Sequence, residues 1–153
     1  MHKIRIYVDT SIFGGMHDEE FAEASERFFK RVLKGDFIIL LSTETLRELS
    51  KAPEDVRAVW RQLPPESLEE VLINEEVAEL AQAYIKANVL GMAAEADALH
   101  VAAATVASAD LILSWNFRHI VNYERIRGFN GVNVANGYRP MTILSPREVS
   151  SDE

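Results

Sequence analysis

A run of five consecutive apolar residues, at positions 37–41, constrains the fold of this chain more than any other feature. A strand that is apolar on both faces belongs inside a sheet that is covered by helices above and below. Another short strand, at 4–8, is rich in β-branched residues and places Tyr7 on the face opposite to its neighbours. Stretches in which apolar residues recur at helical spacing follow both of these expected strands. This alternation predicts an α/β fold with a central, mostly parallel sheet.

The same alternation continues along the chain. We expect strands at 4–8, 37–41, 68–73, 111–114 and 141–144. We expect helices at 21–34, 43–51, 53–60, 74–88 and 95–108, and a further helix that starts after the strand at 111–114 and fades near Gly128. The segments 9–15 and 130–140 are interpreted as a turn and a loop. Because 153 residues are too few for two ordinary domains, we expect one domain over residues 1–149 and a frayed tail at 150–153.

Composition excludes several classes of function. The chain has no cysteine, so disulfide scaffolds, thiolate zinc sites, iron–sulfur clusters and cysteine nucleophiles are excluded. A formal net charge of −8 excludes a uniformly basic nucleic-acid coat but leaves room for a local basic face. The N-terminus lacks the apolar core of a signal peptide, and no apolar stretch reaches the roughly 18 to 20 residues of a membrane span. We therefore expect a soluble, cytoplasmic protein.

Acidic side chains stand where the expected strands end. Asp9 comes directly after the first strand, and Glu44 and Glu48 lie one helical turn apart just after the second. Asp97 lies in a helix whose neighbouring residues are small or apolar, and Asn116 follows the strand at 111–114. Ligands bind at the carboxyl ends of the strands in open α/β sheets, which makes these five residues the candidates for a functional site.

Each acid also has a purely structural interpretation. Asp9 could cap the turn after it, and Glu44 and Glu48 could be solvated helix carboxylates. Asp97 could be a charge that the helix dipole favours, although burial among alanines is costly for a carboxylate that has no partner. If the acids instead converge, a hard cation such as Mg²⁺ or Mn²⁺ would relieve their repulsion and activate a water for attack on a phosphodiester.

Basic residues concentrate late in the chain. Residues 1–110 carry 11 basic and 20 acidic side chains, whereas residues 111–139 carry four arginines and one glutamate. The segment could contact a phosphate backbone or be an ordinary solvated helix face. Its basic residues are Arg118, Arg125, Arg127 and Arg139, with His119 in addition.

Two aromatic residues and one histidine near the candidate acids have structural interpretations as well. Trp115 and Phe117 could stack on bases, but packing in the core is the more common role. His100 follows Asp97 by three residues, and we expect it to be packed or hydrogen-bonded rather than a metal ligand. The four histidines show no zinc-ligand spacing.

Four segments of the chain together resemble a known family. They read Tyr-Val-Asp-Thr-Ser at 7–11, Ser-Thr-Glu-Thr-Leu-Arg-Glu-Leu at 42–49, Asp-Ala-Leu-His-Val-Ala-Ala-Ala at 97–104 and Asp-Leu-Ile-Leu-Ser-Trp-Asn-Phe-Arg-His-Ile at 110–120. Their order and spacing are similar to those of PIN domains, in particular the VapC-like toxin branch. The resemblance implies a three-layer α/β/α fold and a ribonuclease that depends on Mg²⁺ or Mn²⁺.

The resemblance also assigns roles to individual residues. It makes Asp9, Glu48 and Asp97 the acids that hold the cation, with Glu44 as a competing candidate for the second of them. Thr10 and Ser11 match a small hydroxyl position beside the metal. Asn116 stands where many PIN domains have an aspartate, and an uncharged amide there favours one bound cation over two.

The sequence therefore predicts an endoribonuclease that depends on Mg²⁺ or Mn²⁺, with the toxin of a toxin–antitoxin pair as a specific form of it. Ser11, Arg118 and His119 would lie near the RNA substrate, and Asn133 or Arg139 could approach the site from the loop at 130–140. The resemblance further implies a homodimer and a cognate antitoxin protein. The alternatives are a catalytically weak PIN-fold module that binds RNA or protein, and a different metal-dependent phosphohydrolase on a similar scaffold.

Overall fold

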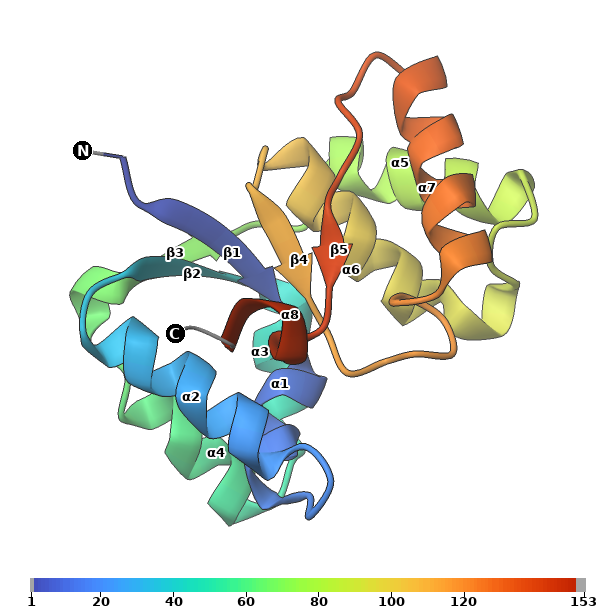
Figure 1. Ribbon diagram of the computed structural model, residues 1–153. Helices are drawn as coiled ribbons and strands as arrows, with labels where there is room; N and C mark the ends of the chain where they lie inside the picture. Colours follow the sequence, from blue (N-terminus) through green and yellow to red (C-terminus); the bar gives the residue numbers. More distant parts are fainter. Residues whose placement is uncertain (1, 151–153) are drawn as a thin grey trace.

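The computed structural model describes residues 2–150 and has three layers, with a sheet between two layers of helices (Figure 1). The sheet has five strands in the order β3-β2-β1-β4-β5, and every pair is parallel. The strands are β1 (Ile4–Val8), β2 (Phe37–Ser42), β3 (Leu68–Val71), β4 (Leu111–Leu113) and β5 (Ile143–Leu144). The predicted α/β/α fold with a central parallel sheet is confirmed.

The two strands that the sequence marked most clearly lie inside the sheet. β2 pairs with β1 and β3, and all but one of its residues are buried. β1 pairs with β2 and β4, and it sends alternate side chains to opposite faces. Tyr7 packs in the core cluster on one face, whereas Ile6 and Val8 pack in the cluster on the other.

Helices cover both faces of the sheet (Figure 1). One face carries α5, α6 and α7, and the other carries α1, α2, α4 and α8, while α3 follows β2 and packs on α1 and α6. The helices are α1 (Thr10–Gly14), α2 (Ala22–Leu33), α3 (Thr43–Ser50), α4 (Glu54–Arg61), α5 (Glu75–Lys86), α6 (Glu95–Val106), α7 (Tyr123–Ala135) and α8 (Pro146–Ser150). Every helix within residues 2–150 falls short of the length and apolar character that a membrane span requires.

The segment after β1 was wrongly predicted to be a turn. It forms α1 and then a 3₁₀ turn, η1 (Gly15–His17). The two glycines suggested a turn, but Gly15 serves a close approach instead, since a Cβ there would lie 2.5 Å from Nε1 of Trp115. The missing side chain makes room for the indole ring.

The helix after β4 begins later and runs further than predicted. Residues 115–122 form turns, and α7 starts after Asn122, whose side chain accepts a hydrogen bond from the backbone N–H of Arg125. Gly128 does not end the helix. A Cβ at Gly128 would lie 2.8 Å from a methyl group of Val89, so glycine there lets α7 pack closely on the segment that contains Val89.

The predicted loop at 130–140 is largely helical, and neither of its two candidate residues reaches the site. Asn133 is buried and accepts a hydrogen bond from the hydroxyl of Tyr84 at 2.5 Å. Arg139 lines a pocket with Asp110 at the amino end of β4, the opposite edge of the sheet. Of the predicted tail, Ser150 belongs to α8, and residues 151–153 lie outside the described residues.

The topology fixes where a ligand can bind. The chain moves outward from β1 through β2 to β3, then returns to add β4 on the other side of β1. The connections that leave the carboxyl ends of β1 and β4 therefore diverge. Such a switch point leaves a crevice at that edge of an open sheet, and Asp9 and Ser114 directly follow these two strand ends.

Candidate active site

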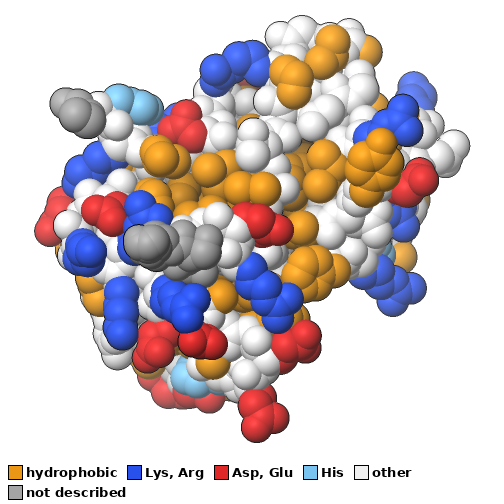
Figure 2. Space-filling view, in the orientation of Figure 1, with side chains coloured by type: hydrophobic (Ala, Val, Ile, Leu, Met, Phe, Trp, Pro, Cys, Tyr) orange, Lys and Arg blue, Asp and Glu red, His pale blue; other side chains and the backbone are white. Residues whose placement is uncertain are grey.

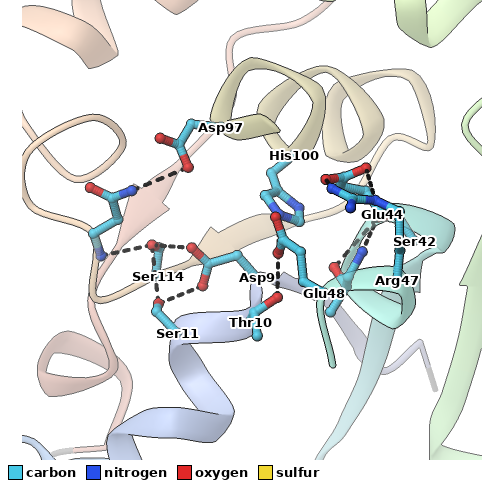
Figure 3. A network of polar contacts seen from close by, with 12 residues as sticks. Asp9, Thr10, Ser11, Ser42, Glu44, Arg47, Glu48, Asp97, His100 and Ser114 are labelled. Atoms are coloured by element: carbon cyan, nitrogen blue, oxygen red, sulfur yellow. Dashed lines mark hydrogen bonds and ion pairs between the residues drawn. The ribbon is translucent and has the colours of Figure 1, made fainter. Parts of the chain in front are cut away.

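Asp9 lies at the switch point and is almost completely buried, with 4% of its surface exposed. It takes the N-cap position of α1, yet its side chain makes no capping hydrogen bond. Its two oxygens instead accept hydrogen bonds from the hydroxyls of Ser11, at 2.6 Å, and Ser114, at 2.7 Å (Figure 3). The turn-capping interpretation therefore does not explain this side chain.

The two serines hold the carboxylate from different elements. The hydroxyl of Ser11 also accepts from the backbone N–H of Trp115, and that of Ser114 accepts from the backbone N–H of Asn116. Burial raises the pKa of Asp9 above its usual value, and this outweighs the charge of His100 and the two hydroxyl donors, which lower it. The charge of Asp97 raises it further. The ionised form of Asp9 is thus held in place but poorly compensated.

Glu48, on α3, is the second acid at this edge. Its Oε1 accepts a hydrogen bond from the hydroxyl of Thr10 (Figure 3). The same oxygen accepts from Nε2 of His100 at 3.0 Å. Burial raises the pKa of Glu48, but the contacts with His100 and Thr10 outweigh it and the net shift is downward. Glu44, the competing candidate, forms an ion pair with Arg47 on the same helix.

His100 connects the acids to the core of the protein. It is 2% exposed, and its Nδ1 lies 2.7 Å from the hydroxyl of Tyr7, which in turn donates to Ser42. Burial lowers the pKa of His100, but Tyr7, Glu48 and Asp9 outweigh it and raise the pKa well above its usual value. The expectation that His100 is packed and hydrogen-bonded is confirmed.

Asp97, in the first turn of α6, is fixed from two sides. Nδ2 of Asn116 donates to its Oδ1 at 3.2 Å, and Nδ1 of His119 lies 2.8 Å from its Oδ2. A carboxylate only accepts, so Nδ1 of His119 carries the hydrogen and Nε2 points away from the pair. The side chains of Asp97 and His119 remain 22% and 27% exposed, which leaves both accessible to a ligand.

The basic residues of 111–139 do not form one surface. Arg118 is exposed on the turn beside Asn116, close to the candidate acids. Arg125 donates to the backbone carbonyl of Val89, and Arg127 lies over the ring of Tyr123. Arg139 lies at the opposite edge, so the predicted basic segment contributes to the site only His119, which contacts Asp97, and Arg118, which shares the turn of Asn116.

Residues 6–121 match the PIN domain family. The chain belongs to that family. The matched range includes Asp9, Glu48, Asp97 and Asn116, and the match confirms the resemblance that the four sequence segments indicated. A search of curated proteins finds no match.

Solved structures with the same fold include a bacterial toxin. A chain in the crystal structure of FitAcB from Neisseria gonorrhoeae matches with a TM-score of 0.59 and 14% identity, over 93% of this chain and 98% of that chain. VapC20 of Mycobacterium tuberculosis, described as a Sarcin-Ricin loop cleaving toxin, matches with a TM-score of 0.56 and 13% identity, over 90% and 98%. VapBC2 from Rickettsia felis, bound to a DNA fragment from its promoter, matches with a TM-score of 0.57 and 11% identity, over 93% and 98%. At these identities the likeness establishes the fold.

The donor set of this PIN domain suits a hard cation in its chemistry. Carboxylate oxygens of Asp9, Glu48 and Asp97 come from three different elements to one edge of the sheet (Figure 3). Within residues 2–150, however, no group of three His, Asp or Glu side chains surrounds a common point as a metal ion requires. The oxygens are instead engaged by neighbouring hydroxyl, amide and imidazole groups, so metal binding would require a rearrangement of side chains.

Two residues of the network were not singled out from the sequence. Ser114 donates to Asp9, and Tyr7 contacts His100, whereas Thr10, which donates to Glu48, had been matched to a small hydroxyl position beside the metal. Ser114 had one signal, its position directly after a strand of the sheet, next to Asn116. Nothing in the sequence indicated that Tyr7 would reach His100, because that contact joins residues 93 positions apart.

Proposed function

We propose that this PIN domain is a ribonuclease that hydrolyses RNA phosphodiester bonds with the help of Mg²⁺ or Mn²⁺. The main support is the placement of Asp9, a buried carboxylate at the switch point whose charge is opposed by burial and by Asp97. A buried carboxylate whose charge is only partly compensated is costly, and a bound dication offsets that cost. The description of VapC20 as a Sarcin-Ricin loop cleaving toxin points to the same substrate class.

Three acids would hold the cation. Asp9 and Asp97 are the first ligands that we propose, because their charges already oppose each other across the site. Glu48 would act directly or through water, since His100 and Thr10 both engage its Oε1. A dication bound there supplies positive charge that stabilises the negative charge developing on a phosphate under attack.

The remaining polar residues would position the acids and the RNA. Ser11 and Ser114 fix the direction of Asp9, and Asn116 holds Asp97 by a hydrogen bond rather than by acting as an acid. Arg118, exposed beside these residues, would contact a phosphate of the RNA, and His119 would face it through its free Nε2.

Cleavage of RNA with and without the acids tests the proposal. We expect the parent chain to cleave single-stranded RNA in Mn²⁺ or Mg²⁺ and to lose cleavage in EDTA. Asp9→Asn and Asp97→Asn should lose both cleavage and the heat of Mn²⁺ binding in calorimetry. Asp55→Asn, an exposed carboxylate on α4, is the matched control and should retain both. Cleavage that survives EDTA, or equal activity in all variants, would exclude the mechanism.

We further propose that the protein acts as the toxin of a pair, as a homodimer that a cognate antitoxin inhibits. The structural neighbour VapC20, which is described as a toxin, supports the first part of this proposal. Expression of the parent chain should arrest growth of a bacterial host, whereas Asp9→Asn should not. A monomer in sedimentation, or no effect on growth, would contradict this more specific proposal and leave the nuclease proposal standing.

Asn116 favours a second candidate function, a PIN-fold module that binds RNA or protein but cleaves weakly. An amide brings no charge to the position where many PIN domains have an acid. In this case the parent chain would bind single-stranded RNA in an anisotropy titration but would cleave it no faster than Asp9→Asn does.

A further inference from the structure

The turn after β4, which also carries Asn116, presents an aromatic ring to solvent. Phe117 follows Asn116 directly and remains 41% exposed. Its ring packs at an angle on two others, with 6.1 Å between ring centroids to both Trp115 and Phe21. Trp115 and Phe21 stack on each other at 4.1 Å. Phe117 is thus the outermost ring of a three-ring cluster.

The cluster is held firmly at its base. Trp115 is 5% exposed, donates from its indole to the hydroxyl of Ser25 at 2.9 Å, and packs against Gly15. The backbone N–H of Phe117 donates to the carbonyl of Trp115 at 3.0 Å, so the turn itself fixes where the third ring stands. A ring fixed in this way loses little conformational freedom when a ligand packs on it.

Positive charge flanks the rings. The guanidinium of Arg147 lies 5.3 Å from the ring of Trp115 and 5.5 Å from that of Phe21, and it also approaches Glu20 at 3.7 Å. Arg118 follows Phe117 and is exposed. Around α8, Figure 2 shows hydrophobic side chains adjoining Lys and Arg side chains on this face of the molecule. An exposed ring in a cluster that an arginine contacts, with a second arginine next to it in sequence, suits the chemistry of a nucleobase and its phosphates.

We propose that Phe117 is a stacking platform for an unpaired nucleobase of RNA whose backbone lies at the candidate acids. The inference rests on the proposed function and assigns Phe117 a role in holding the RNA substrate. Only an unpaired base can offer a free face to a side chain, because bases in an A-form duplex are stacked and their deep groove is closed to side chains. Stacking also tolerates any base, so Phe117 selects for strandedness rather than for sequence.

Binding of RNA to Phe117 variants tests the platform. We would measure the affinity of the full chain for a labelled single-stranded oligoribonucleotide in EDTA, by fluorescence anisotropy, and repeat it with the same strand annealed into a duplex. Phe117→Ala should weaken single-strand binding by about 5- to 150-fold, and Phe117→Trp should retain it. Phe117→Leu keeps the apolar contact with Phe21 but has no aromatic face, so it should behave like Phe117→Ala.

Leu33→Ala is the matched control for loss of an exposed apolar side chain. Leu33→Ala removes an exposed apolar side chain at the opposite end of α2 from Phe21 and should leave binding unchanged. Single-strand affinities within twofold of the parent for both Phe117→Ala and Phe117→Leu would overturn the platform. Equal losses of affinity for duplex RNA would also overturn the platform. A parent chain that fails to bind single-stranded RNA in EDTA would overturn it too, since stacking needs no cation. RNA binding that depends on Phe117 without cleavage would keep the platform and reject the nuclease.

Discussion

The side-chain amide of Asn116 joins Asp97 to the turn after β4. Its Nδ2 donates to Oδ1 of Asp97 at 3.2 Å, and its Oδ1 accepts from the backbone N–H of His119 at 2.9 Å. The position therefore needs a donor and an acceptor on one short side chain. An aspartate supplies only acceptors, so it could not make the first of these bonds while ionised.

This geometry predicts that Asn116→Asp destabilises the protein without metal. The change removes a hydrogen bond and sets a second carboxylate against Asp97, for a loss of about 1–3 kcal/mol. In a protein of this size, each kcal/mol lowers the melting temperature by about 2–4 °C. Thermal melts in EDTA and in Mn²⁺ would measure the decrease in melting temperature. We expect Mn²⁺ to reverse most of the decrease, because a dication offsets the added charge.

Asn88→Asp is the control for adding a negative charge. Asn88 is exposed after α5, away from the candidate site, and the change there should shift the melting temperature little. If Asn116→Asp melts at or above the parent in EDTA, the amide is not needed to hold Asp97.

The raised pKa of Asp9 predicts how the stability of the protein depends on pH. Because burial raises its pKa in the folded protein, the unfolded chain ionises first as the pH rises, and folding loses stability from about pH 4 upward. Asp9→Asn does not ionise, so it should melt above the parent at neutral pH in EDTA. The difference should shrink as the pH falls toward about 4 and vanish below about 3, where Asp9 is protonated in both states. Melting curves across this pH range would measure it.

Mn²⁺ separates this effect from a general change in stability. It should raise the melting temperature of the parent at neutral pH and leave that of Asp9→Asn unchanged, since stabilisation requires binding to the folded state. A variant that is less stable than the parent at every pH would contradict the conclusion that Asp9 is poorly compensated.

Gly15 supplies a test of packing beneath the site. A Cβ at this position would lie 2.5 Å from Nε1 of Trp115 and 2.6 Å from the hydroxyl of Ser25, both of them buried side chains. Gly15→Ala should therefore cost about 1–3 kcal/mol, a value typical of overpacked cores. Urea denaturation followed by tryptophan fluorescence would measure the change.

The neighbouring glycine is the matched control. Nothing lies within 4 Å of a Cβ built on Gly14, which ends α1 in a helical conformation. Gly14→Ala should be neutral or stabilise the protein by up to about 1 kcal/mol. Equal effects of the two substitutions would mean that Trp115 does not require the space at Gly15.

The strands and the positions of the acids could be predicted from the sequence because local rules determine them. The apolar run of β2 and the alternation of β1 follow from the two-residue repeat of a strand, and a parallel sheet brings carboxyl ends to one edge. Asp9, Glu48 and Asn116 were placed at that edge on these grounds. Asp97 was singled out by its small and apolar neighbours and by the PIN resemblance, and the structure brings all four residues to the same edge.

The errors arose where a contact distant in sequence decides the local structure. Gly15 and Gly128 were interpreted as turn and stop signals, but each accommodates a side chain from elsewhere, Trp115 in one case and Val89 in the other. Likewise, Asn133 was interpreted as part of a loop because its partner Tyr84 stands 49 positions earlier. Backbone propensity carries no information about such partners.

Arg118 and Arg139 allow the direction of RNA binding to be tested with matched changes of charge. Both are exposed, but Arg118 lies beside Asn116 at the carboxyl edge, whereas Arg139 lines a pocket at the amino end of β4. If RNA lies across the acids, Arg118→Ala should weaken binding to single-stranded RNA and reduce the slope of log affinity against log salt by about 0.7, the value for one phosphate contact. Arg139→Ala removes the same charge and should change neither quantity. Anisotropy titrations over a range of salt would measure both slopes. Equal losses in the two variants would indicate attraction by overall charge alone, and would remove the support for an RNA path across the carboxyl edge of the sheet.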